Sequence, residues 1–143
     1  MLTRDQQYAI SANERVTKIN KDYGDDEQSK RKYGSTAHKL PILIRTAGLA
    51  QALTFIETRG SSKDKVNPYK DFLRDLETTV GKDEQRSLCE RARGEHKAPD
   101  EEASLDEYML LTQQVLNALL WYKRFAQSIL DVDASASIDE GEE

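Results

Sequence analysis

Apolar side chains recur along most of the chain at intervals of three and four residues, which is the period of an α-helix. The stripe nearest the N-terminus comprises Tyr8, Ala12, Val16, Ile19 and Tyr23. Thr3 is suited to capping the start of this helix, and Gly24 is suited to ending it. The pattern predicts a first amphipathic helix between Thr3 and Gly24.

A second apolar region runs from Leu40 to Ile56, where 11 of the 17 residues are apolar and lie on nearly all sides of a helix. A helix of that kind is typically central and buried. Pro41 lacks a backbone donor, so it predicts a kink or the start of a new helix. Gly48 predicts a second break, after which the helical pattern continues to Gly60.

Residues 61–67 are polar and predict a loop, and Asn67 followed by Pro68 is typical of a helix start. The stripe of this helix comprises Tyr69, Phe72, Leu73, Leu76 and Val80. It stops at Gly81. A short helix is predicted within residues 83–94, with an inward face of Leu88, Cys89 and Ala92.

The last helix carries the longest stripe in the chain. Ser104 and Glu107 have the spacing of a capping box at its start. Its inward face comprises Tyr108, Leu111, Val115, Ala118, Leu119, Tyr122, Ala126 and Ile129. Trp121 lies off this stripe, which indicates either an interface anchor or a second core face.

No stretch alternates apolar and polar residues as a strand would. The sequence therefore predicts an all-α protein, a single compact bundle of five or six helices without a sheet, over residues 1–130. The net charge is -5, but residues 131–143 hold six acids and no base, so the preceding 130 residues carry +1. We expect residues 131–143 to be a flexible, disordered acidic tail.

The composition excludes several classes of protein. One cysteine, Cys89, allows no intramolecular disulfide and is typical of a reducing compartment. The N-terminus has no apolar signal region, and the longest apolar run is too short and interrupted to span a bilayer. We expect a cytoplasmic protein.

Residues typical of catalysis or metal binding are few. His38 and His96 fall in no motif with Cys89, and no zinc-ligand spacing is present. The tail resembles a calcium loop, with oxygen ligands at Asp131, Asp133, Ser135, Asp139 and Glu142. Ala136 stands where that loop needs glycine, so we favour a disordered tail and expect no catalytic residue, metal or cofactor.

A basic region crosses the first two predicted helices, and Gln28 to Ile56 contains no Asp or Glu. Its cations are Arg15, Lys18, Lys21, Lys30, Arg31, Lys32, Lys39 and Arg45. Together they would suit a phosphate backbone, although most clusters of this kind are solvated surfaces. Tyr23 and Tyr33 lie beside them and are suited either to stacking on bases or to packing in the core.

The segment LPILIRTAGLAQALTFI resembles a motif of the small helical subunit of type III-B CRISPR effector complexes, the Cmr-type RNA-targeting complex. The matching residues are Leu40, Pro41, Ile44, Gly48, Leu49, Leu53 and Phe55. The N-terminal TRDQQYAISANERV and the closing LNALLWYKRFAQ, with Lys123 and Arg124, are also similar to this family. The resemblance covers most of residues 3–130.

The resemblance implies a non-catalytic subunit of an RNA-guided antiviral complex. Such subunits stack on copies of themselves beside the filament that holds the guide RNA, and their basic face helps bind the target RNA. Under this interpretation Lys123 and Arg124 join the RNA-binding residues or contact a neighbouring subunit. Two alternatives remain: a protein-interaction scaffold that never touches nucleic acid, and a small enzyme or calcium-responsive protein that uses the tail.

Overall fold

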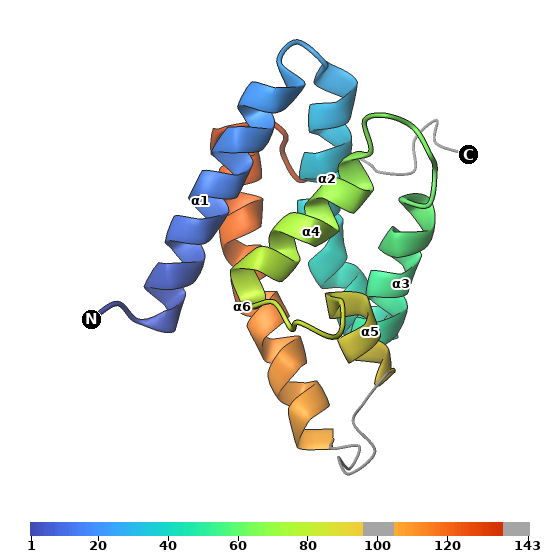
Figure 1. Ribbon diagram of the computed structural model, residues 1–143. Coiled ribbons are helices and arrows are strands. Elements are labelled where there is room, and N and C mark those ends of the chain that lie inside the picture. The colour runs from blue at the N-terminus through green and yellow to red at the C-terminus, as the bar shows by residue number, and fades with distance from the viewer. Residues whose placement is uncertain (96–104, 136–143) are drawn as a thin grey trace.

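The computed structural model describes residues 1–95 and 105–135, and within these ranges the chain forms six helices and no strand (Figure 1). The helices are α1 (Arg4–Tyr23), α2 (Glu27–Ala47), α3 (Leu49–Arg59), α4 (Pro68–Val80), α5 (Leu88–Arg93) and α6 (Leu105–Ser128). The predicted all-α bundle is confirmed.

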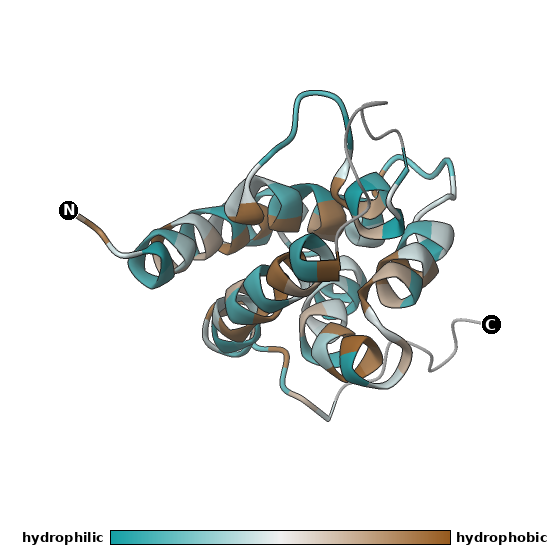
Figure 2. Ribbon diagram, turned by 90° about the horizontal axis from the view of Figure 1, so that it is seen from below, coloured by the Kyte–Doolittle hydropathy of each residue, from teal (hydrophilic) through white to brown (hydrophobic). Residues whose placement is uncertain are grey.

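Helix α2 is the centre of the bundle, because it contacts α1, α3, α4 and α6. Helices α1 and α6 lie side by side, and α4 packs across both of them and across α2 (Figure 1). The short helix α5 contacts α3. Figure 2 shows brown and teal bands around each helix, as expected where one side of an amphipathic helix is buried.

Most helix ends follow from the residues that were predicted to form them. Thr3 accepts a hydrogen bond from the backbone amide of Gln6 and takes part in a capping box. Asn67 caps α4, with Pro68 at its first position. Gly24, Gly48 and Gly81 follow α1, α2 and α4 with positive φ angles, which glycine adopts without strain. The predicted cap at residue 104 lies outside the described residues.

Of the two breaks predicted in the second apolar region, the one at Gly48 is confirmed, because it separates α2 from α3. No new helix starts at Pro41, because α2 runs through it to Ala47. The region is also less enclosed than expected, because Ile42 and Phe55 are 54% and 42% exposed. Apolar residues on nearly every side of a helix cannot all be buried when only three or four neighbours cover it.

Aromatic rings form the middle of the core. Phe72 lies between Tyr33 and Tyr122, with ring centroids 5.1 Å and 5.4 Å away in edge-to-face geometry. Tyr33 and Tyr122 are fully buried, and Tyr23 packs edge-on against Tyr33. Of the two uses considered for Tyr33, stacking on bases is therefore excluded and core packing is confirmed.

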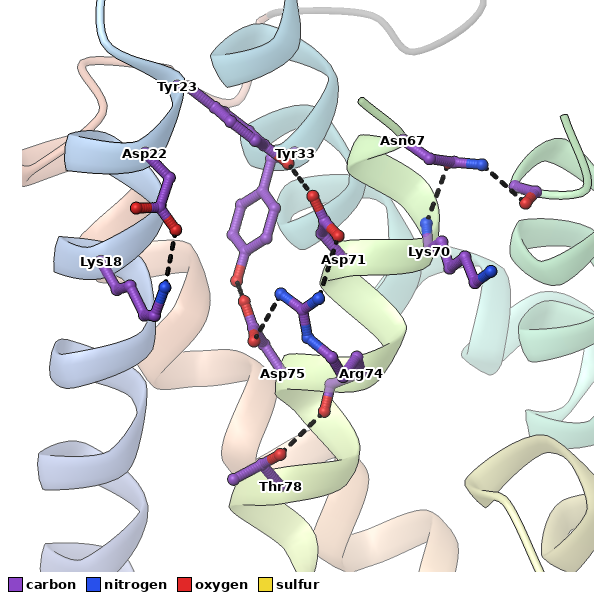
Figure 3. Close-up of polar contacts among 11 residues, drawn as sticks. Lys18, Asp22, Tyr23, Tyr33, Asn67, Lys70, Asp71, Arg74, Asp75 and Thr78 are labelled. Carbon is purple, nitrogen blue, oxygen red and sulfur yellow. Dashed lines mark hydrogen bonds and ion pairs between the residues drawn. The ribbon is translucent and has the colours of Figure 1, made fainter. Parts of the chain in front are cut away.

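A polar cluster that the apolar stripes did not reveal lies against these rings (Figure 3). The Asp75 carboxylate is buried and accepts a hydrogen bond from the Tyr33 hydroxyl at 2.7 Å. Burial raises the pKa of Asp75, and the bond from Tyr33 and the nearby Arg74 and Arg15 charges oppose this shift. Burial also raises the pKa of Tyr33, so this hydroxyl stays a donor.

The chain beyond α6 stays packed further than predicted. Val132 is only 7% exposed, and its carbonyl accepts a hydrogen bond from Nε2 of His38 at 2.8 Å. It sits on Gly34 of α2, where a Cβ would lie 2.6 Å from the Val132 Cβ. We call residues 130–132 the C-terminal strap. Leu130 and Val132 are therefore packed on the bundle, and residues 136–143 lie outside the described part.

Among the helices of the described ranges, none combines the length and the apolar character needed to cross a membrane.

Candidate nucleic-acid interface

Helix α2 carries four of the predicted cations at exposed or partly exposed positions. Arg31 and Arg45 are exposed and Lys32 and Lys39 are partly exposed, whereas residues 33–38 between them are buried on every side of the helix. By helical periodicity, at 100° per residue, the four cations lie within about 140° of one another around the helix axis, and we call Arg31, Lys32, Lys39 and Arg45 the α2 row. From Arg31 to Arg45 the row spans about 21 Å at 1.5 Å per residue. No acidic residue of α2 interrupts it, because the only acid of this helix is Glu27.

The predicted cations of α1 do not extend the row. Arg15 is half-buried at the edge of the packed face of α1, close enough to α4 for its charge to lower the pKa of Asp75. Lys18 pairs with Asp22 at 2.8 Å, and both side chains are about half exposed or more. Lys21 is exposed in the last turn of α1. These three residues therefore form a separate and partly neutralised group.

Lys30 also stands apart from the row. Its side chain is only 14% exposed, and its ammonium lies 3.8 Å from Glu27 one turn earlier. Because the aliphatic part of the Lys30 side chain is largely buried and its ammonium group is paired, Lys30 is less available to an external phosphate than the sequence suggested.

A hollow beside the N-terminal half of α2 holds cations that sequence reasoning missed. It measures about 280 Å³, and we call it the Arg59 hollow; its lining is Lys32, Arg59, Ser62, Asp64, Val66, Asn67, Pro68 and Tyr69. The Arg59 guanidinium lies over the rings of Phe55 and Tyr69, at 5.5 Å and 5.4 Å from their centroids. Cation–π contacts of this kind attract the guanidinium to the rings and so hold its charge at the wall of the hollow.

Two lysines lie beside this hollow. Lys63 and Lys65 are exposed on the loop that forms its wall, whereas Lys70 of α4 lines a different hollow that also contains Glu57 and Glu77. The alternation of lysine with lining residues in SSKDKVN was the only signal for them in the sequence. Because Lys32 belongs both to the α2 row and to the hollow, the two form one continuous basic surface.

Lys123 and Arg124 lie elsewhere, in a second hollow of about 580 Å³. We call it the Trp121 hollow; its lining is Asp5, His38, Leu120, Trp121, Lys123, Arg124, Gln127 and Ala134. The Trp121 indole donates a hydrogen bond to Asp5 at 2.9 Å, and its ring stacks on Phe125 at 5.9 Å. Trp121 therefore joins α6 to the start of α1.

The residues considered for catalysis are not arranged for it. Cys89 is buried against α3, and burial raises the pKa of its thiol to about 12, which disfavours the reactive thiolate. His38 bonds to the C-terminal strap and not to Cys89. His96 lies outside the described residues. Residues 1–95 and 105–135 contain no group of three side chains suited to holding a metal ion. Of the five calcium-ligand candidates, Asp139 and Glu142 lie outside that part of the chain.

Fold and surface together define a small all-helical protein with a basic helix face. Comparison with known proteins is consistent with this class. The family described as CRISPR-associated protein (Cas_Cmr5) matches residues 4–129, so the chain belongs to that family.

A relative from Thermus thermophilus, described as CRISPR system Cmr subunit Cmr5, is 39% identical over 131 residues. That alignment covers 92% of this chain and 99% of the relative. The crystal structure of a CRISPR-associated Cmr5 family protein from the same organism superposes with a TM-score of 0.68 at 38% identity. It covers 90% of this chain and 98% of the other. The resemblance seen in the sequence is therefore confirmed.

Proposed function

We propose that this protein is a non-catalytic small subunit of a type III-B CRISPR complex, which silences RNA under the direction of a guide and so defends the cell against viruses. Family membership and the name of the Thermus relative support the assembly. The buried, high-pKa thiol of Cys89 supports a role without chemistry. The protein then works in the cytoplasm beside the other subunits of its complex.

The observation that carries the RNA-binding part of the proposal is the α2 row. Four cations on one side of a helix, over about 21 Å, suit the phosphates of an extended RNA strand. Contacts of this kind position the strand without reading its sequence, so specificity comes from pairing with the guide. Copies of the subunit stack along the filament, and each adds a few phosphate contacts that together hold what one copy cannot.

The test is to replace Arg31, Lys32, Lys39 and Arg45 by glutamine and to measure target-RNA retention by the assembled complex at several salt concentrations. Removing one phosphate contact to a single strand lowers the slope of log K against log salt by roughly 0.7, so removing four from each copy of the subunit lowers it by about 3 per copy. Ultraviolet crosslinks from bound RNA should fall within α2.

A matched variant carries glutamine at Arg4, Lys18, Lys21 and Lys82, which are exposed and lie outside α2. It removes the same charge and should retain the RNA nearly as well as the unmodified protein. An equal loss in both variants would mean that net charge, and not the α2 row, holds the RNA.

A protein-interaction scaffold is the second candidate function, and Ile42 favours it. This side chain is 54% exposed in the middle of the α2 row, where an apolar group suits a protein neighbour better than a phosphate. If Ile42→Asp releases the subunit from its complex while no RNA crosslink reaches α2, this second function is the correct one.

A further inference from the structure

Helix α6 carries a second apolar stripe, on its solvent side. Leu105, Met109 and Leu120 are 71%, 59% and 56% exposed, and Leu116 between them is half-buried. At 100° per residue these four side chains lie within about 60° of one another, and about 120° from the middle of the buried side of α6. In Figure 1 the first turns of α6 extend beyond the start of α1. Single exposed apolar residues are ordinary, whereas an aligned set about 22 Å long is typical of an interaction surface.

The charged residues of α6 are confined to its two ends. Asp106 and Glu107 are its only acids, and Lys123 and Arg124 are its only bases. The helix macrodipole favours acids in the first turn, but its effect fades within one turn, and the last turn of α6 holds no base. The dipole therefore does not account for Lys123 and Arg124. Neither Asp106 nor Arg124 forms an ion pair with another residue of the described ranges.

This arrangement of charge is complementary to itself when two copies of α6 run antiparallel. Asp106 and Arg124 are 18 residues apart, which is five turns at 3.6 residues per turn, so both lie on the same side of the helix. That side is the edge of the apolar stripe. A two-fold pairing centred at the level of Val115 places Asp106 of each copy beside Arg124 of the other. Met109 of each copy then packs against Leu120 of the other.

We propose that the exposed stripe of α6 is a self-association surface, through which two copies of this chain pair antiparallel about a two-fold axis. The same surface serves both copies, so the pair is closed and cannot grow into a filament. The pairing is therefore distinct from the stacking of copies in the proposed function and does not rest on it.

The size of the stripe sets the expected strength of the pairing. A surface about 22 Å long on a helix about 10–12 Å across covers roughly 220–260 Å² of each copy. A standard specific interface covers about 800 Å² per partner, so this pair is a weak and reversible one. We expect a Kd on the order of 0.1 mM.

Sedimentation velocity of the full chain tests the pairing directly. Between about 10 µM and about 1 mM the average mass should rise from that of one chain towards that of two, as a Kd on the order of 0.1 mM requires. Met109→Asp and Leu120→Asp should each raise the Kd at least about tenfold, because each buries an unpaired carboxylate in the interface. Ile10→Asp is the matched control and should leave the Kd unchanged, since Ile10 is exposed on the side of α1 opposite to its buried residues. A single chain at every concentration, or an equal loss with Ile10→Asp, would overturn the proposal.

A charge exchange tests the antiparallel orientation. Asp106→Lys alone and Arg124→Glu alone should each weaken association at least about fourfold, because each replaces two attractive contacts of the pair by two repulsive ones. The double variant that carries both substitutions should associate within about twofold of the unmodified chain, because the attraction is restored with its sign reversed. A double variant that associates no better than the single ones would mean that Asp106 and Arg124 do not meet, and the proposed pairing would be wrong.

Crosslinking tests the register. Leu116 lies one residue from the centre of the pairing, so Leu116→Cys places two cysteines about 3 Å apart along the helix axes. Mild oxidation should therefore join two chains with Leu116→Cys. Leu105→Cys is the control, because its two copies would lie about 30 Å apart along the axes although Leu105 is the more exposed residue. Equal crosslinking of the two variants would show that random collision, and not the proposed pair, brings the chains together.

Discussion

Replacing Gly34 by alanine tests whether the C-terminal strap is seated as the structure shows. In an isolated helix this change stabilises by about 0.5–1 kcal/mol, because glycine loses more backbone entropy on folding. In this chain the added Cβ would lie 2.6 Å from the Val132 Cβ and 2.8 Å from its Cγ1. Since real Cβ atoms essentially never approach another carbon so closely, Val132 must shift away from its seat on Gly34.

The cost of that displacement can be worked from the interactions it removes. Exposing a buried valine costs about 1.5–3 kcal/mol. Losing the hydrogen bond between His38 and the Val132 carbonyl costs about 0.5–1.5 kcal/mol. After subtracting the helix-propensity gain, Gly34→Ala should lower the free energy of unfolding by about 1–4 kcal/mol.

The assay is urea unfolding followed by circular dichroism, in the full chain and in a chain that ends at Asp131. The truncated chain has no Val132, so Gly34→Ala should there raise stability by about 0.5–1 kcal/mol. The effect of one substitution thus changes sign between two backgrounds. A stabilising effect in the full chain would show that Val132 is not seated on Gly34, and an equal destabilisation in both chains would place the clash elsewhere.

Three further predictions concern the core. Phe72→Ala should lower the free energy of unfolding in urea by about 3–5 kcal/mol, because this ring is fully buried between two others. As a control, Ile42→Ala should change it by less than about 0.5 kcal/mol, because the Ile42 side chain is exposed. The pKa of Asp75 is raised in the folded state, so the folded state binds a proton at this carboxyl more readily than the unfolded state does. The contribution of Asp75 to stability is therefore present below its unfolded pKa of 3.8 and is lost as the pH rises through its folded pKa. The stability of Asp75→Asn relative to the unmodified chain should therefore increase from about pH 4 to about pH 7, and a decrease in paired unfolding curves would refute the assignment. Cys89 should react with a thiol reagent at about pH 8 only as fast as the chain opens, since its pKa is raised to about 12; rapid modification of the native protein would contradict its burial.

The helices and their ends could be predicted because their causes are local. A stripe of apolar residues at helical spacing identifies the buried side of α1, α4 and α6. A capping residue such as Thr3 or Asn67 acts on amides only two or three positions away. The short helix α5 was found from the small inward set that includes Leu88 and Ala92, both of which are buried.

The cationic surface was only half predictable, for a related reason. Composition identified the acid-free stretch of α2, and helical geometry places Arg31 and Arg45 on its exposed side. The sequence does not show which acidic side chain each cation meets. Arg15 was therefore grouped with the cations of α2, although its charge acts on Asp75 of α4. Arg59 was missed because it lies outside any basic run and meets Lys32 only after α2 and α3 have packed.

The order of the amino acids was sufficient to establish the all-helical class, the positions of most helix ends and the family to which the chain is similar. Packing between helices was needed to show that Asp75 is buried beneath Tyr33, that Val132 closes over Gly34 and that Arg59 joins Lys32 in one hollow. The pairs Tyr33–Asp75, Gly34–Val132 and Lys32–Arg59 are separated by 27 to 98 positions in the chain. Helical periodicity carries no information over such distances, because it states which side of a helix is buried and not which residues of another helix will cover it.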